Sequence, residues 1–115
     1  MAKRKSRIQL RSGSELDGLR EAGAKAAEVL QLSAELAKAG TTTGEIDLAA
    51  RDFMADRSCV SAFLGYKGFP GQICISVNEE VVHGIGGSRV LEEGDVVKID
   101  VGIRTESGWI GDNAK

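Results

Sequence analysis

Apolar and small residues recur at near-helical spacing along the first third of the chain. Ser14 with Asp17 three residues on forms a capping-box signature, so we expect a helix to start there. Lys38 and Gly40 are typical signals for the end of a helix. The pattern predicts one helix over residues 15–39. Its apolar stripe consists of Leu16, Leu19, Gly23, Ala26, Leu30 and Ala37.

A second, shorter helix is predicted next, and strands after it. Thr42 with Glu45 repeats the capping signature, and the apolar stripe behind it fades near Arg57. Short apolar runs broken by glycine and proline then predict a strand over residues 59–63, a loop over 66–71, a strand over 73–77 and a turn over 91–95. Two helices followed by strands predict an α+β domain, with both helices packed on one face of an antiparallel sheet.

The clearest period-two pattern lies near the end of the chain, in residues 97–112. If a three-residue loop pairs Arg104 with Gly108, then Asp100 lies directly opposite Asp112. Opposed carboxylates with Cβ atoms about 4.5–5.5 Å apart repel unless a cation or a shared proton lies between them, and a divalent metal suits such oxygen ligands. The other face of the first strand carries the aliphatic side chains of Ile99, Val101 and Ile103.

The net charge of −2 hides an uneven distribution. Five of the fifteen basic residues fall before Ser12, which leaves ten basic against 17 acidic residues in the rest. We expect a basic, disordered arm over residues 1–13 and one domain over residues 14–115. The arm leaves attraction to RNA or another polyanion open. Because the sequence stops inside the predicted hairpin strand, we also expect this domain to be truncated at its C-terminal end.

Membrane insertion and export are not expected. No apolar run approaches the roughly 18 residues of a spanning helix, and residues 1–10 lack the apolar segment of a secretory signal. Cys59 and Cys74 show neither a CxxC spacing nor the density of a disulfide scaffold, so we expect reduced thiols in the cytoplasm.

His83 is the single histidine, and it stands between a predicted strand and the glycine-rich loop 84–87. It is either a substrate-binding or proton-transferring imidazole or a hydrogen-bonded structural residue. The loop lacks the Gly-Lys-Ser/Thr of a phosphate site, so its glycines indicate turns and close approaches. Glu79 and Glu80 are interpreted as a solvated turn.

Three ordered blocks carry a specific resemblance. The runs GYKGFPGQICISVNEEVVHGIGG, LEEGDVVKIDVG and GWIGD resemble the N-terminal half of a type I methionine aminopeptidase, a metallopeptidase with the pita-bread (creatinase/aminopeptidase) fold. The resemblance covers residues 14–115. It implies a cytoplasmic enzyme that removes the initiator methionine of nascent proteins, a monomer at full length, with the ribosome as a further partner and no membrane or specific DNA partner.

The resemblance also implies a site. Asp100 would ligate one of two divalent ions (Co, Mn, Fe, Zn or Ni), Asp112 would bridge both, and His83 would contact substrate and assist proton transfer. The ions would activate a water for attack on the first peptide bond. The expected pocket for the methionine side chain consists of Tyr66, Phe69, Cys74 and Phe63, the last at a position where many members carry a smaller residue.

The family's remaining ligands, a histidine and two glutamates, have no positions in this sequence, and neither does its general base. We therefore expect the 115-residue chain alone to be inactive. The interval from Asp100 to Asp112 is one residue longer than is common in the family. Two alternatives stay open: a non-catalytic pita-bread protein that binds RNA or ribosomes, and a proline-specific pita-bread peptidase.

Overall fold

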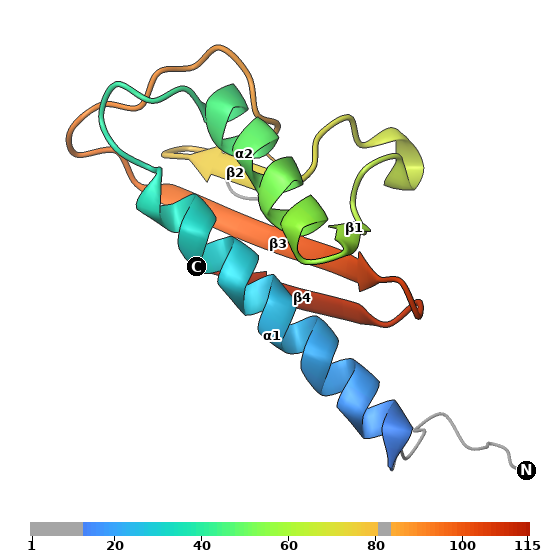
Figure 1. Cartoon of the computed structure of the whole chain (residues 1–115). Helices are drawn as coiled ribbons and strands as arrows, with labels where there is room; N and C mark the ends of the chain where they lie inside the picture. Colours follow the sequence, from blue (N-terminus) through green and yellow to red (C-terminus); the bar gives the residue numbers. More distant parts are fainter. Residues whose placement is uncertain (1–12, 81–83) are drawn as a thin grey trace, which may run out of the picture.

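A computed structural model describes residues 13–80 and 84–115. The expected α+β architecture is confirmed: two helices lie on one face of a four-stranded antiparallel sheet (Figure 1). Apart from Gly13, the predicted basic arm lies outside the described residues. The elements in chain order are α1 (Ser14–Glu35), α2 (Thr43–Asp56), β1 (Cys59–Ser61), a 3₁₀ turn (Tyr66–Gly68), β2 (Cys74–Val77), β3 (Val97–Thr105) and β4 (Ile110–Ala114).

Strand β3 is the centre of the sheet. Its residue Arg104 pairs with both β1 and β4, and its residue Asp100 pairs with both β2 and β4. Because a strand has two edges, β1 and β2 must lie end to end along one edge of β3, and β4 must fill the other. The loop 62–73 therefore leaves and re-enters the same edge of the sheet.

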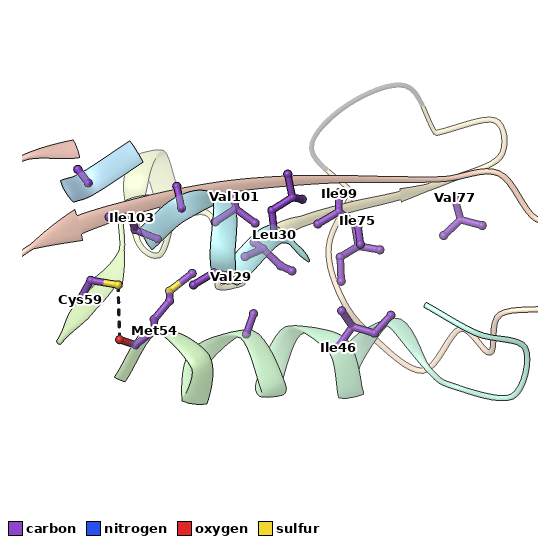
Figure 2. Close-up of a cluster of buried hydrophobic side chains, with 14 of the residues drawn as sticks. Val29, Leu30, Ile46, Met54, Cys59, Ile75, Val77, Ile99, Val101 and Ile103 are labelled. Carbon is purple, nitrogen blue, oxygen red and sulfur yellow. Dashed lines mark hydrogen bonds between the residues drawn. The ribbon is translucent and has the colours of Figure 1, made fainter. Parts of the chain in front are cut away.

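The hydrophobic core fills the space between the sheet and the two helices. Helix α1 packs along β3 and β4, and α2 packs against β1. The alternation expected in β3 is confirmed, because Ile99, Val101 and Ile103 are at most 2% exposed and face the helices (Figure 2). In the part of the chain that the structure describes, no helix has the length and apolar character needed to cross a membrane.

Helix α1 differs from the prediction at both ends. Gly13 is its N-cap, without a side-chain capping hydrogen bond, and the predicted cap residue Ser14 is the first helical residue. The helix ends at Glu35 and not near residue 39. The following segment pairs with the chain that precedes β3: Gly40 N–H donates to Leu91 O and Leu91 N–H donates to Thr41 O, both at 2.9 Å. These long-range bonds replace the helical bonds that the sequence pattern favoured.

The buried stripe of α1 is also rotated from the predicted one. Ala26 and Leu30 of the predicted stripe are buried, but Leu19 is 36% exposed and Gly23 is exposed, whereas Ala22 is fully buried. A Cβ atom on Gly111 of β4 would collide with the carbonyl of Ala22, so helix and strand touch backbone to backbone. Only small residues fit at this contact, so the larger Leu19 side chain does not lie there.

The prediction for α2 is confirmed. Thr42 Oγ1 accepts from Glu45 N–H at 3.1 Å, the Glu45 side chain accepts from Thr42 N–H at 2.8 Å, and Arg57 is the C-cap. Strand β1 is shorter than predicted and ends at Ser61, because the chain then turns out of the sheet.

The hairpin register was predicted wrongly. Asp112 lies opposite Gly102, and Asp100 lies opposite Ala114. The loop does have three residues, but Thr105 and Trp109 close it: Thr105 N–H donates to Trp109 O at 2.9 Å. Gly108 has a φ of 92°, which favours glycine, so it belongs to the loop and not to the strand. Since this shift moves each pairing by two residues, both aspartates stay on the same face.

Candidate metal centre and substrate pocket

The face of the sheet opposite the helices carries a cavity of about 600 Å³. The side chains of Asp100 and Asp112 form its floor, and the loop 62–73 forms a wall. All six of the metal and pocket residues predicted within the described chain line it. The full lining is Phe63, Tyr66, Lys67, Gly68, Phe69, Pro70, Cys74, Ile85, Asp100 and Asp112.

The two aspartates are diagonal neighbours across the β3–β4 ladder. Diagonal partners lie about 7–8 Å apart at Cα and somewhat less at Cβ, wider than a directly opposed pair. Asp100 is half-buried and Asp112 is exposed. The two carboxylates can therefore approach a common cation from two sides, and hard oxygen donors of this kind suit a divalent ion.

Gly102 and Phe63 join the floor of the cavity to its wall. Gly102 is next to both aspartates on this face, directly opposite Asp112 and two residues from Asp100, and a Cβ atom there would lie 2.6 Å from the Phe63 ring. The ring of Phe63 meets that of Phe69 edge to face, with centroids 6.4 Å apart and an angle of 80° between the ring planes. The wall beside the carboxylates is thus aromatic and apolar.

Cys74 lies on the other edge of β3, directly opposite Asp100. Its side chain is 4% exposed. Burial first, and then the negative charges of Asp100, Asp112 and Asp47, raise the pKa of the Cys74 thiol to about 11. The thiol is therefore neutral at physiological pH and contributes a small apolar surface.

The outer rim of the cavity is more exposed. Tyr66 is 65% exposed, and Lys67 Nζ lies 5.5 Å from the centre of its ring. Lys67 and Pro70 were not predicted as pocket residues. They neighbour Tyr66 and Phe69 in the predicted loop 66–71, and this adjacency could have identified them. Ile85 had no local signal. It reaches the cavity because Gly84 bonds to β2, donating to Ser76 Oγ at 3.0 Å.

His83 lies outside the described residues, so its role stays a prediction. In residues 13–80 and 84–115, no three acidic, cysteine or histidine side chains gather closely enough to hold a metal ion. Asp100 and Asp112 fit the chemistry of one side of a metal site, and the described residues do not complete it. The predicted roles of the six lining residues likewise remain predictions.

Comparison with known proteins identifies the class of protein to which this chain is related. The sequence model of metallopeptidase family M24 matches residues 17–115. The chain is 40% identical over 109 residues to a methionine aminopeptidase of Clostridium acetobutylicum (94% of this chain, 43% of that protein) and 45% identical over 100 residues to methionine aminopeptidase 1 of Bacillus subtilis (87% and 40%). The match makes this chain a relative of metal-dependent peptidases.

More specifically, the chain belongs to metallopeptidase family M24. The fold agrees, since the crystal structure of methionine aminopeptidase from Rickettsia prowazekii superposes with a TM-score of 0.89 at 34% identity. That superposition covers 94% of this chain and 43% of the other. The chain spans about two fifths of the length of the relatives that it matches.

Proposed function

We propose that this chain supplies one side of the active site of an aminopeptidase that removes the N-terminal methionine of nascent polypeptides in the cytoplasm. The observation that carries the proposal is the shared cavity: two carboxylates on adjacent strands adjoin an aromatic, apolar wall. The homology to methionine aminopeptidases supports the choice of substrate.

In this proposal Asp100 and Asp112 hold two divalent ions, drawn from Co, Mn, Fe, Zn or Ni. When bound, such ions supply a more acidic water and polarise a carbonyl. The side chains of Phe63, Phe69 and Cys74 receive the unbranched methionine side chain by apolar contact. His83 contacts the substrate and assists proton transfer.

The 115-residue chain alone is proposed to be inactive, because two carboxylates do not complete a two-metal site. Further ligands must come from residues other than those described. The ribosome is the further partner in this proposal, because it presents nascent chains and attracts basic segments such as residues 3–11.

The test is a peptide panel with the protein encoded by the complete reading frame, supplied with Mn, Fe or Co ions. We expect release of methionine from Met-Gly-type peptides, loss of that release in Asp112→Asn, and full activity in the matched control Glu106→Gln, which alters an exposed carboxylate of the hairpin loop. Cleavage before proline with none after methionine would instead establish a proline-specific peptidase. Turnover by the 115-residue chain alone, abolished by Asp112→Asn, would refute its inactivity.

A further inference from the structure

The cavity wall is a loop whose shape the sheet does not determine. Residues 62–73 connect two strands on the same edge of β3. Strand pairing stops at Ser61 and resumes at Cys74, and one further bond to β3 runs from Ala62 N–H to Gly102 O at 2.8 Å. A loop of this length is ordinarily mobile unless other groups hold it. The positions of Phe63 and Phe69 therefore depend on contacts from outside the ladder.

Gln72 is held from both sides at the point where the loop returns. Its N–H donates to the carboxylate of Asp47, at 2.9 Å to Oδ1 and 3.2 Å to Oδ2, and its carbonyl accepts from Ser61 Oγ at 2.6 Å. Ile73 N–H also donates to Asp47 Oδ1, at 3.0 Å. These contacts fix the residues that lead directly into β2.

Ser61 connects this returning end to the outgoing end. Its Oγ accepts from Phe63 N–H and Leu64 N–H, each at 3.0 Å, while it donates to Gln72. One hydroxyl thus bridges both ends of the loop, and Asp47 attaches the bridge to helix α2. The backbone of Phe63 is itself held by this bridge, through its N–H.

Asp47 is tightly confined. It lies in α2, whose start is fixed by the Thr42–Glu45 capping box. A Cβ atom on Gly86 would come within 2.8 Å of Asp47 Cβ, and one on Gly71 within 3.2 Å of Asp47 Oδ1. The two glycines leave room for a side chain of this length, so the carboxylate has a set position on a rigid element.

We propose that Asp47 is a positioning residue for the substrate pocket, holding the loop 62–73 so that Phe63 and Phe69 stand beside the two carboxylates. This inference rests on the proposed function. Asp47 lies on the helix side of the sheet's edge and touches the loop backbone, so it acts through the wall and not on the substrate. A wall that loosens weakens binding of the substrate and of the transition state alike, which raises KM more than it lowers kcat.

The experiment compares Asp47→Ala, Asp47→Asn and Asp47→Glu with the matched control Asp52→Ala. Asp52 is exposed on the same helix and contacts Arg51. Amide exchange of Gln72 and Ile73 is measured by NMR in the 115-residue chain. Steady-state kinetics on a Met-Ala peptide are measured in the enzyme from the complete reading frame.

We expect Asp47→Ala to speed exchange of both amides by at least about 10-fold, since a charged acceptor is lost. The value of kcat/KM should fall by about 10-fold to 100-fold, mostly through KM. Asp47→Asn keeps an acceptor oxygen in place. Its amide exchange rates and its kcat/KM should therefore stay close to those of the parent. Asp47→Glu keeps the charge but moves it, so its effects should resemble those of Asp47→Ala. If Asp47→Ala does not fold, Asp47→Glu is used in its place.

Unchanged exchange at Gln72 and Ile73 would overturn the proposal, and so would faster exchange with an unchanged KM. Equal effects of Asp47→Ala and Asp52→Ala would overturn it as well. A parent enzyme that releases no methionine contradicts the proposed function instead, and the exchange measurement then still decides whether Asp47 holds the wall.

Discussion

Asp112 lies opposite Gly102 in the β3–β4 ladder, and the ring of Phe63 covers that glycine. The position next to both aspartates on this face therefore has no side chain of its own. An aromatic ring from the loop 62–73 fills the space instead. This relationship brings the acidic floor and the apolar wall of the cavity into direct contact.

Gly102→Ala should destabilise the chain, because its methyl group would overlap the Phe63 ring. We expect a loss of about 1–3 kcal/mol, typical of an overpacked site, measured as a lower urea midpoint. The control is Gly23→Ala, at an exposed helical position where an added Cβ meets nothing within 4 Å. That change should stabilise by about 0.4–1 kcal/mol. A Gly102→Ala chain as stable as the parent would show that Phe63 does not occupy this position.

Ser33→Ala should stabilise the chain. Ser33 is fully buried in α1, and its Oγ has no hydrogen-bond partner among the described residues. Alanine removes this buried hydroxyl and is also the better helix former, so we expect a gain of about 1 kcal/mol. The midpoint of urea unfolding measures the gain, and a lower midpoint would mean that the hydroxyl has a partner.

The cap of α2 should make stability depend on pH in the acid range. Hydrogen bonds from the backbone and side chain of Thr42 hold the pKa of Glu45 below its ordinary value of 4.5. A lowered folded-state pKa gives stability that is present above pH 4.5 and is lost as the pH falls through the lowered value. Thermal melts from pH 7 to pH 3 should therefore show a shallower acid decline in Glu45→Gln than in the parent.

The matched control for this pH series is Glu93→Gln, in the exposed turn before β3. Its acid decline should follow that of the parent chain. A Glu45→Gln profile parallel to the parent's would mean that the capping carboxylate does not contribute to the acid transition.

Local patterns predicted those parts of the fold whose cause is local. The Thr42–Glu45 cap and the alternation of Ile99, Val101 and Ile103 needed no knowledge of distant residues. The end of α1 could not be predicted in this way, because Gly40 bonds to Leu91, fifty-one positions further along the chain. The rotation of the α1 stripe has the same origin, since Gly111 decides which residues fit against the helix.

In the candidate site, too, features with a local cause were predicted and features that depend on distant residues were not. The alternation of side chains along a strand predicted that Asp100 and Asp112 share one face of the sheet. This prediction is correct although the predicted register was wrong, because the actual pairing differs from the predicted one by two residues. The sequence did not reveal Asp47 or Ser61, whose contacts join a helix, a strand end and a loop return. Nothing in the residues around Asp47 distinguishes it from a solvated helical carboxylate.

The proposed function requires Asp100 and Asp112 to face a common cation. A titration of the ¹⁵N-labelled 115-residue chain with Mn²⁺, followed by NMR line broadening, measures whether they do. We predict that broadening appears first at the amides of residues 101–102 and 111–113, that Asp100→Asn and Asp112→Asn each suppress it, and that Glu93→Gln leaves it unchanged. Broadening that persists in either aspartate variant, or that appears first at the exposed turn 92–95, would contradict the claim.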